Sequence, residues 1–109
     1  MSNFTTLGKN KSLNGLNPTT MTIHSGNPGA TGSDNQIGDP QNCTFGSASN
    51  GERNLTNTPE FNVSAGTTVA WLVVWDNDGD AIAIDPLANP ETYSNNGIHR
   101  ISSAKLEAN

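Results

Sequence analysis

The stretch Val69-Ala70-Trp71-Leu72-Val73-Val74-Trp75, followed at once by Asp76-Asn77-Asp78-Gly79-Asp80, is the densest run of bulky apolar residues in this 109-residue chain. Seven apolar residues in a row that end in turn formers predict one buried β-strand running into a turn. Successive side chains of a strand point to opposite faces, so the odd-numbered residues of the run would share one face and the even-numbered residues the other. Both faces are apolar, which is typical of a strand with packing on each side. The rest of the chain must therefore wrap around this strand.

The composition around this run favours a small all-β domain. Only 32% of the residues are hydrophobic, and 11 Gly and 6 Pro join abundant Asn, Thr and Ser as turn formers. Short strand candidates separated by turn signals recur about every 8 to 12 residues, which predicts about seven to nine strands in an antiparallel β-sandwich, jelly-roll or Ig-like. Besides the central run, the candidates are Thr20–His24, Cys43–Phe45, Leu55–Thr58, Phe61–Val63, Ala81–Ile84, Glu91–Tyr93, Ile98–Ile101 and Lys105–Ala108.

The pattern divides the chain into an N-terminal arm, residues 1–17, and a single β-sandwich domain, residues 18–109. The arm is polar, and Gly8 and Gly15 weaken any helical turn within it. Such a segment has little to fold against by itself, so we expect it to gain order by docking on a neighbouring molecule.

Two loops and one hairpin turn are predicted within the domain. Ser25 to Gln41 contains six Gly and Pro residues and is predicted to be a long loop without a strand. Asp78-Gly79 is a favourable centre for a type I′ hairpin turn, since both residues tolerate positive φ. Pro86 and Pro90 are predicted to bracket a further loop.

Charge and cysteine content exclude several classes of function. The formal net charge is -5 with five Lys and Arg in total, too few for the basic patch that nucleic acid requires. Cys43 is the one cysteine, so neither an intramolecular disulfide nor a Cys-based zinc site can form, and we expect a small core or surface residue. No apolar run approaches the about 20 residues needed to cross a bilayer, and no signal peptide is recognisable, so we expect a soluble protein without membrane contact.

Two motifs resemble ligand sites but lack essential parts. Asp76, Asp78 and Asp80 match the first half of a calcium loop, yet Ala81 and Leu87 occupy the positions that require Gly and a bidentate Glu. We therefore predict a solvated hairpin tip and no bound metal. The stretch 26–34 contains three Gly-X-Y triplets, too few for a collagen helix, and it lacks the ending of a phosphate-binding loop. It is interpreted as a flexible connection that contacts neighbouring chains.

No catalytic signature is present. The sequence has no Gly-x-Ser-x-Gly elbow and no His-Glu-x-x-His motif, and no pair of carboxylates lies in an apolar setting. His24 and His99 are expected at surface or strand-edge positions rather than in a metal or catalytic site. We therefore predict no catalytic, cofactor-binding or metal-binding residues and no enzymatic activity.

The order of four segments resembles the small β-domain virion proteins of tailed bacteriophages, especially the siphophages of actinobacteria. The segments are Thr22–Gly32, Thr44–Gly51, Val63–Asp76, and Pro90–Tyr93 with Asn96-Gly97. The similarity covers about Thr20 to Ala108. Members of that family are minor tail proteins, tail-fibre proteins or accessory proteins of the capsid surface. The resemblance implies a particle, and it implies neither a cofactor nor a reaction.

The leading hypothesis is a non-enzymatic structural protein of a tailed-phage virion, present in many copies as a capsid decoration or a minor tail protein. Its expected partners are the major capsid or tail proteins and further copies of itself, in a homotrimer or another closed ring, assembled in the host cytoplasm. The alternative is a carbohydrate- or host-receptor-binding module of a tail fibre, with Trp71, Trp75 or Tyr93 as a stacking platform. Two tryptophans in a continuous apolar strand are more often core residues, which favours the structural hypothesis.

Overall fold

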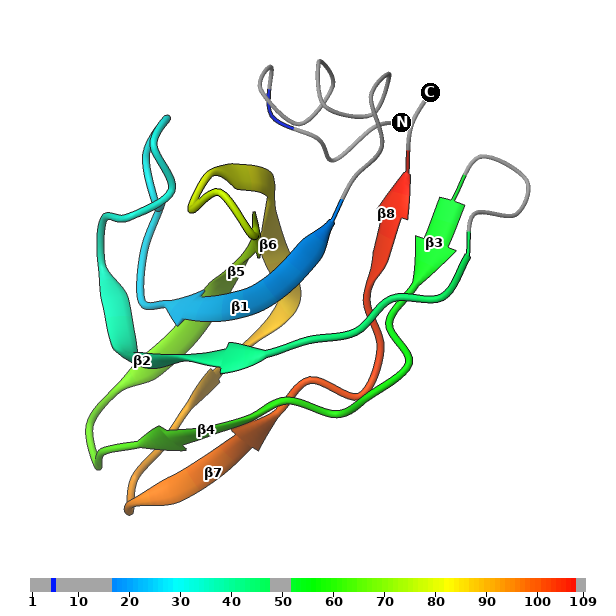
Figure 1. Ribbon diagram of the computed structural model, residues 1–109. Helices are drawn as coiled ribbons and strands as arrows, with labels where there is room; N and C mark the ends of the chain where they lie inside the picture. The colour runs from blue at the N-terminus through cyan, green and yellow to red at the C-terminus, as the bar shows by residue number, and fades with distance from the viewer. Residues whose placement is uncertain (1–4, 6–16, 48–51, 108–109) are drawn as a thin grey trace.

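The computed structural model describes Thr5, residues 17–47 and residues 52–107. These residues form an all-β structure without a helix, and every strand pairing in it is antiparallel, as the composition predicted. Eight strands follow one another along the described chain (Figure 1). They are β1 (Pro18–His24), β2 (Gln36–Asn42), β3 (Glu52–Asn54), β4 (Glu60–Val63), β5 (Thr68–Asp76), β6 (Ala81–Thr92), β7 (Gly97–Arg100) and β8 (Lys105–Glu107).

Four strands form the main sheet, in the order β2-β1-β5-β6. The apolar run 69–75 lies in β5, which pairs with β1 on one side and with β6 on the other. The prediction that this run is a strand is therefore confirmed, and β5 is a central strand of the sheet.

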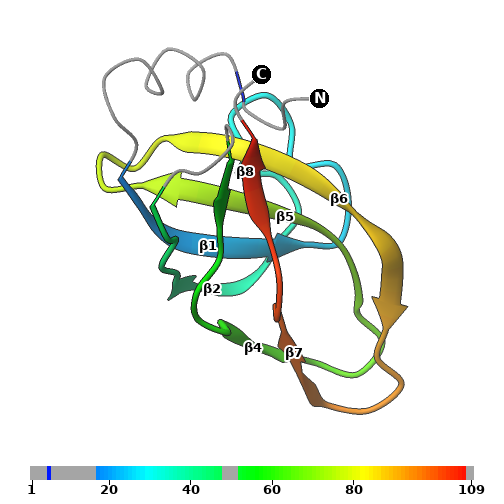
Figure 2. The ribbon, with the colours of Figure 1, turned by 90° about the vertical axis from the view of Figure 1, so that its right-hand side faces the viewer.

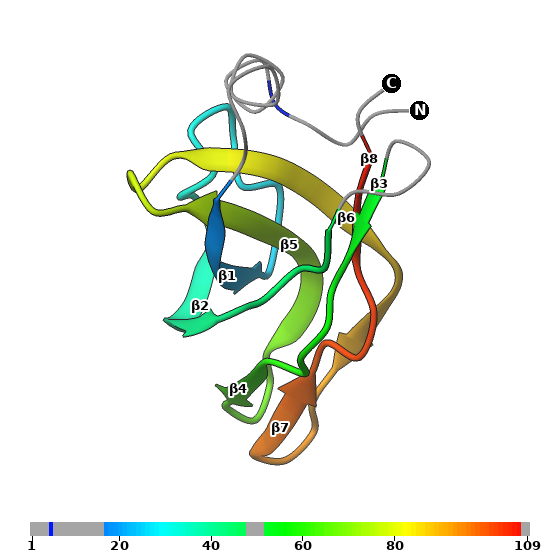
Figure 3. The same cartoon turned by 45° about the vertical axis from the view of Figure 1, so that its right-hand side comes forward.

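The remaining strands form two ribbons, β4 with β7 and β3 with β8. The ribbons are two parts of one interrupted antiparallel ladder, because Leu55 N–H donates to the Ala104 carbonyl (2.8 Å) and Ile101 N–H donates to the Pro59 carbonyl (3.1 Å) between them. Figures 2 and 3 show both ribbons on the same side of the four-stranded sheet. One face of that sheet, here called the inner face, therefore packs against the ribbons, and the opposite face is called the outer face.

The hydrophobic core lies between the inner face and the ribbons. Burying these side chains is the main favourable contribution to folding, at about 25 cal/mol per Å² of apolar surface. Phe61 of β4 is its largest side chain and is 2% exposed. The core consists of Met21, Ile23, Cys43, Phe61, Val63, Val69, Leu72, Val74, Ile82, Ala83, Ile101 and Leu106.

Neither tryptophan belongs to this core, which corrects the prediction made from the apolar run. The pairing of β5 with β6 is irregular between Val69 and Trp71, so Val69 lies on the inner face with Leu72 and Val74 rather than with the odd-numbered residues. An irregularity of this kind moves a side chain to the other face. Trp71 and Trp75 are left on the outer face, where both are partly exposed.

The predicted loop Ser25 to Gln41 is wrong in its second half, because β2 begins at Gln36. This strand was not predicted because Gly38 and Pro40 are residue types that usually indicate a loop. Pro40 is tolerated because β2 is an edge strand with only β1 as its neighbour in the sheet. Gly38 has φ 65° at the point where the register with β1 shifts, a conformation that glycine adopts without strain.

The expected loop between Pro86 and Pro90 is instead part of β6, which also includes most of the predicted strand Glu91–Tyr93. The ladder passes from the pair Trp71–Pro86 to the pair Val69–Glu91, so β6 advances five residues while β5 advances two. The proline-bounded segment is therefore a wide bulge within one long strand. As in β2, the prolines are tolerated because β6 forms the other edge of the sheet.

Two further predictions need correction. Asn77 and Asp78 do not have positive φ, whereas Gly79 has φ 83°, and Gly79 N–H donates to the Asp76 carbonyl. The turn is therefore a three-residue loop with a glycine bulge rather than type I′. The predicted strands Cys43–Phe45 and Leu55–Thr58 are reduced to a single bridge between Phe45 and Leu55.

The other predicted strands coincide with observed ones. Thr20–His24 lies in β1, Phe61–Val63 in β4, Ala81–Ile84 in β6 and most of Ile98–Ile101 in β7. Lys105–Ala108 corresponds to β8, with Ala108 outside the described residues. Residues 1–4, 6–16, 48–51 and 109 also lie outside them.

Candidate functional site

The outer face of the sheet is partly covered by residues 25–35, which fold back over it. Pro28 and Gly32 of this segment are buried, and a Cβ atom added at Gly32 would lie 2.7 Å from Ala81 Cβ and 3.5 Å from Trp75 Cη2. The glycine therefore lets the backbone lie directly on the sheet. The stretch that was interpreted as a flexible connection therefore packs on its own sheet, and its predicted contact with neighbouring chains stays a prediction.

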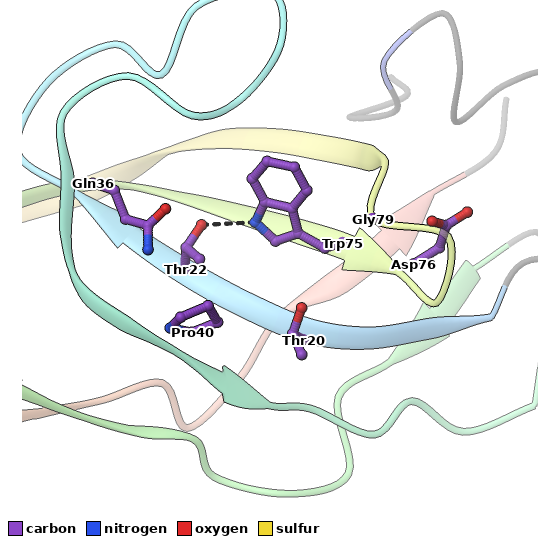
Figure 4. A pocket seen from close by; sticks show the side chains of 7 residues that line it. All are labelled: Thr20, Thr22, Gln36, Pro40, Trp75, Asp76 and Gly79. Atoms are coloured by element: carbon purple, nitrogen blue, oxygen red, sulfur yellow. Dashed lines mark hydrogen bonds between the residues drawn. The ribbon is translucent and has the colours of Figure 1, made fainter.

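Trp75 is held on the outer face by a chain of hydrogen bonds to β1. Its Nε1–H donates to Thr22 Oγ1 at 2.8 Å, as drawn in Figure 4. His24 Nδ1 lies 2.7 Å from the Asp34 carbonyl, which can only accept, so Nδ1 carries the proton. In the neutral ring Nε2 is then an acceptor, and it receives the Thr22 hydroxyl proton at 2.7 Å. One continuous network thus joins β5, β1 and the covering segment.

His24 is fully buried, and not at the surface or a strand edge as expected. Burial lowers the pKa of His24 from its ordinary value of 6.5, and it outweighs the hydrogen bond to the Asp34 carbonyl and the charge of Asp34, which both act in the opposite direction. The folded protein therefore favours the neutral ring that the hydrogen-bond network requires.

The network makes folding stability sensitive to mild acid. Because the pKa of His24 is lower in the folded state, the unfolded state binds more protons below about pH 6.5, and the free energy of unfolding falls as the pH decreases. One proton can contribute a slope of at most about 1.4 kcal/mol per pH unit. Urea denaturation between pH 7.5 and 5 should show this slope in the wild type and a smaller slope in His24→Gln. Equal slopes in the two proteins would contradict a titrating role for His24.

A groove of about 240 Å³ lies on the outer face beside Trp75. Its walls come from three strands of the sheet and from the hairpin between β5 and β6. Figure 4 shows Trp75, Thr20 and Thr22 on the same side of the sheet, with Gln36 and Pro40 on the β2 side. The lining residues are Thr20, Thr22, Gln36, Pro40, Trp75, Asp76 and Gly79.

The acidic hairpin tip borders one end of this groove. Carboxylate oxygens of Asp76, Asp78 and Asp80 lie within 4.8 Å of one another. Asp76 is only 5% exposed, and its Oδ1 accepts the backbone N–H groups of Asp78 and Asp80 at 3.0 and 3.1 Å. The predicted solvated tip is therefore wrong for Asp76, which stabilises the turn from within.

A second polar cluster joins β6 to β7, at the far end of the molecule from the hairpin tip. The Tyr93 hydroxyl donates to Glu91 Oε1 at 2.7 Å, and His99 Nδ1 lies 3.0 Å from the same oxygen. The hydrogen bonds from Tyr93 and His99 lower the pKa of Glu91, while burial and the Glu91 carboxylate raise the pKa of Tyr93 to about 12. Gly97 leaves space for the Tyr93 ring, since a Cβ atom there would approach it to 2.9 Å. The cluster therefore stabilises the turn between β6 and β7.

The three sequence-derived candidates for a stacking platform are at separate places. Trp75 lines the groove, Tyr93 belongs to the β6–β7 cluster, and Trp71 is partly exposed on the outer face but does not line the groove. The groove brings Trp75 together with Thr20 and Gln36, which the sequence did not single out. Neither had a local signal, because Gln36 becomes a neighbour only through the pairing of β2 with β1.

No protein-family model matches this chain, and no curated protein is similar to it. Within the part of the chain that the structure describes, no helix has the length and apolar character needed to span a membrane.

Proposed function

We propose that this chain is a non-enzymatic structural protein of a tailed-phage virion, an accessory β-domain present in many copies as a capsid decoration or a minor tail protein. The observation that carries the proposal is how the segments that resemble the phage family are used. Gly32 of the first segment packs on Trp75 of the third, and Gly66 N–H of the third donates to the Tyr93 carbonyl of the fourth at 2.7 Å. These residues maintain the fold rather than assemble reactive groups.

The arrangement of the strands supports a two-layer antiparallel sandwich for this domain. The four-stranded sheet is one layer, and the interrupted ribbon of β4-β3 against β7-β8 is the other, with the apolar core between them. We infer a jelly-roll or Ig-like sandwich of this kind, the architecture that the resemblance implies.

An exposed sheet edge suggests how copies assemble. β6 is an edge strand, and it accepts a backbone hydrogen bond from Thr5 N–H at the Ile82 carbonyl (3.0 Å), while Thr5 Oγ1 donates to the Ala81 carbonyl (2.9 Å). Edge strands readily accept a further segment of chain. We propose that the N-terminal arm makes this type of contact with neighbouring copies or with the underlying shell, within a homotrimer or another closed ring.

Particle location is the direct test of this function. Labelled antibody against the protein, applied to intact particles and viewed by negative-stain microscopy, should mark either the head or the tail. Excess denatured protein should compete for the antibody and remove the label equally well from heads and from tails, which shows that the label reports this protein. Labelling of neither part would overturn the proposal.

Deleting Met1 to Leu16 should separate folding from assembly. The truncated domain should remain folded and lose about 1 to 2 kcal/mol, since the deletion removes the backbone and side-chain hydrogen bonds that Thr5 makes to β6 and leaves the core intact. Attachment to particles that lack the protein should be abolished in a co-sedimentation assay. Thr5→Ala, which removes the hydroxyl and the γ-methyl group but keeps the backbone N–H, is the matched control and should still attach. Full binding by the truncated protein would assign attachment to a face of the sheet instead.

The alternative function, a carbohydrate- or host-receptor-binding module of a tail fibre, is favoured by one specific observation. Trp75 is partly exposed and lines a groove, whereas a core tryptophan would be covered on all sides. A binding site of this kind is compatible with either location on a particle.

A further inference from the structure

We propose that the groove beside Trp75 binds a neutral carbohydrate through one sugar ring. This inference goes beyond a structural role, because a decoration protein needs no small-molecule site. It rests on the outer face of the sheet alone and does not require that the chain belong to a virion.

An aromatic ring in a fixed position is the first requirement of a sugar site, and Trp75 meets it. The indole is bound at one end by its Nε1–H bond to Thr22 and approached at the other end by the backbone of Gly32. The ring is therefore oriented before any ligand arrives, which lowers the entropic cost of binding. Its partly exposed surface borders the groove, where the C–H groups of a sugar can pack against it (Figure 4).

Neutral hydrogen-bonding groups beside an aromatic ring are the second requirement. Among the described residues, Thr20 Oγ1 has no hydrogen-bond partner, and Gln36 uses Nε2 for the Gly38 carbonyl while its Oε1 has none. Both side chains line the groove, where Gln36 is exposed and Thr20 is half-buried. A hydroxyl and an amide can donate to and accept from the hydroxyl groups of a sugar.

Charge decides between sugar and the other ligands that stack on tryptophan. No Lys or Arg is among the residues that line the groove, and the acidic tip borders it, so phosphates and acidic sugars are disfavoured. The lining carboxylate, Asp76, is 5% exposed and bound to two backbone N–H groups, so it does not present the open negative charge that an ammonium ligand requires. Neutral sugars, which carry many hydroxyl groups, are the remaining class of ligand.

The size of the groove limits the ligand. Pockets for drug-sized molecules have volumes of about 300 to 1,000 Å³, and this groove has about 240 Å³. One sugar ring is therefore the expected unit of recognition, as a monosaccharide or the end of a chain. With so few contact atoms, we expect a dissociation constant on the order of 1 mM.

The test uses the full-length protein. A glycan array with neutral, acidic and amino sugars identifies candidates, and each is then titrated while the two indole N–H signals are followed by NMR, assigned with Trp71→Phe. A neutral sugar should shift the Trp75 signal and leave the Trp71 signal in place. A response only to acidic sugars or to choline would overturn the proposal. So would the absence of any response when the sugar concentration is about 20 times the expected dissociation constant of about 1 mM.

Two surface variants avoid the risk of unfolding that a Trp75 substitution carries. Thr20→Val and Gln36→Ala should each weaken binding about threefold to tenfold, the effect of one lost hydrogen bond. Thr92→Val is the matched control, because Thr92 lies outside the groove and hydrogen-bonds Thr68 at the far end of the sheet. Unchanged affinity in both groove variants, or an equal loss in Thr92→Val, would contradict the assignment. Failure of this test leaves particle location, and hence the proposed function, untouched.

Discussion

Trp75→Ala should lower the free energy of unfolding by about 3 kcal/mol, the lower end of the range for removing a large aromatic side chain from a packed site. The ring is partly exposed, which reduces the loss, but it fills the space between β5 and the covering segment at Gly32. Its removal also deprives Thr22 Oγ1, in a buried residue, of a donor. Urea denaturation of the full chain measures the change.

Trp75→Phe separates the contribution of packing to this loss of stability from the contribution of the hydrogen bond. Phenylalanine keeps most of the apolar contact and removes the Nε1–H bond, so the expected loss is only about 1 kcal/mol. A loss under about 1 kcal/mol in Trp75→Ala itself would mean that the ring contributes little to packing, and the outer face would then be an open platform.

Gly32→Ala is expected to cost about 2 to 5 kcal/mol, because two penalties combine at this position. Gly32 has φ 83°, where an L-residue is strained by about 1 to 2 kcal/mol. The new Cβ atom would also lie 2.7 Å from Ala81 Cβ, so the covering segment must move away from the sheet, at about 1 to 3 kcal/mol for overpacking.

Gly66→Ala is the matched control for this substitution. Gly66 has φ 85°, almost the same as Gly32, and a Cβ atom there would meet nothing within 4 Å. The free energy of unfolding of Gly66→Ala should therefore fall only by the cost of backbone strain, about 1 to 2 kcal/mol. Thermal or urea denaturation of both variants gives the contribution of packing as their difference. Equal losses would show that residues 25–35 are not held against the sheet.

Periodicity in the sequence was sufficient where one strand has a clear apolar face. β4 alternates and β5 is a continuous apolar run, and both were located to within one or two residues. β7 was located equally well, although its Ile98 is 44% exposed and its His99 is buried. β2 could not be predicted, since its sequence includes Gly38, Asp39 and Pro40, and Ile37 is its single apolar residue. Its strand conformation arises from pairing with β1, which is a long-range interaction.

The groove could not be predicted for a related reason. The irregularity after Val69 places Val69 on the inner face with Leu72 and Val74 and leaves the tryptophans on the outer face, and nothing in the run itself marks that position. Gly32 and His24 were visible in the sequence, but their roles depend on a segment that folds back across the sheet. The packing of residues 26–34 on their own sheet was missed for this reason, and their predicted contact with other molecules stays a prediction.

The buried cysteine offers an internal reporter of how often the two layers separate. Cys43 is the only cysteine, is 3% exposed within the core, and has a pKa that burial raises to about 11. The thiolate is the reactive form, so alkylating reagents and oxidants react with this residue only when the core opens. The rate of Cys43 alkylation therefore measures core opening in the free chain and in any assembly. In the proposed assembly, a chain with this single buried thiol could not form a network of disulfides between copies, so non-covalent contacts would hold the copies together.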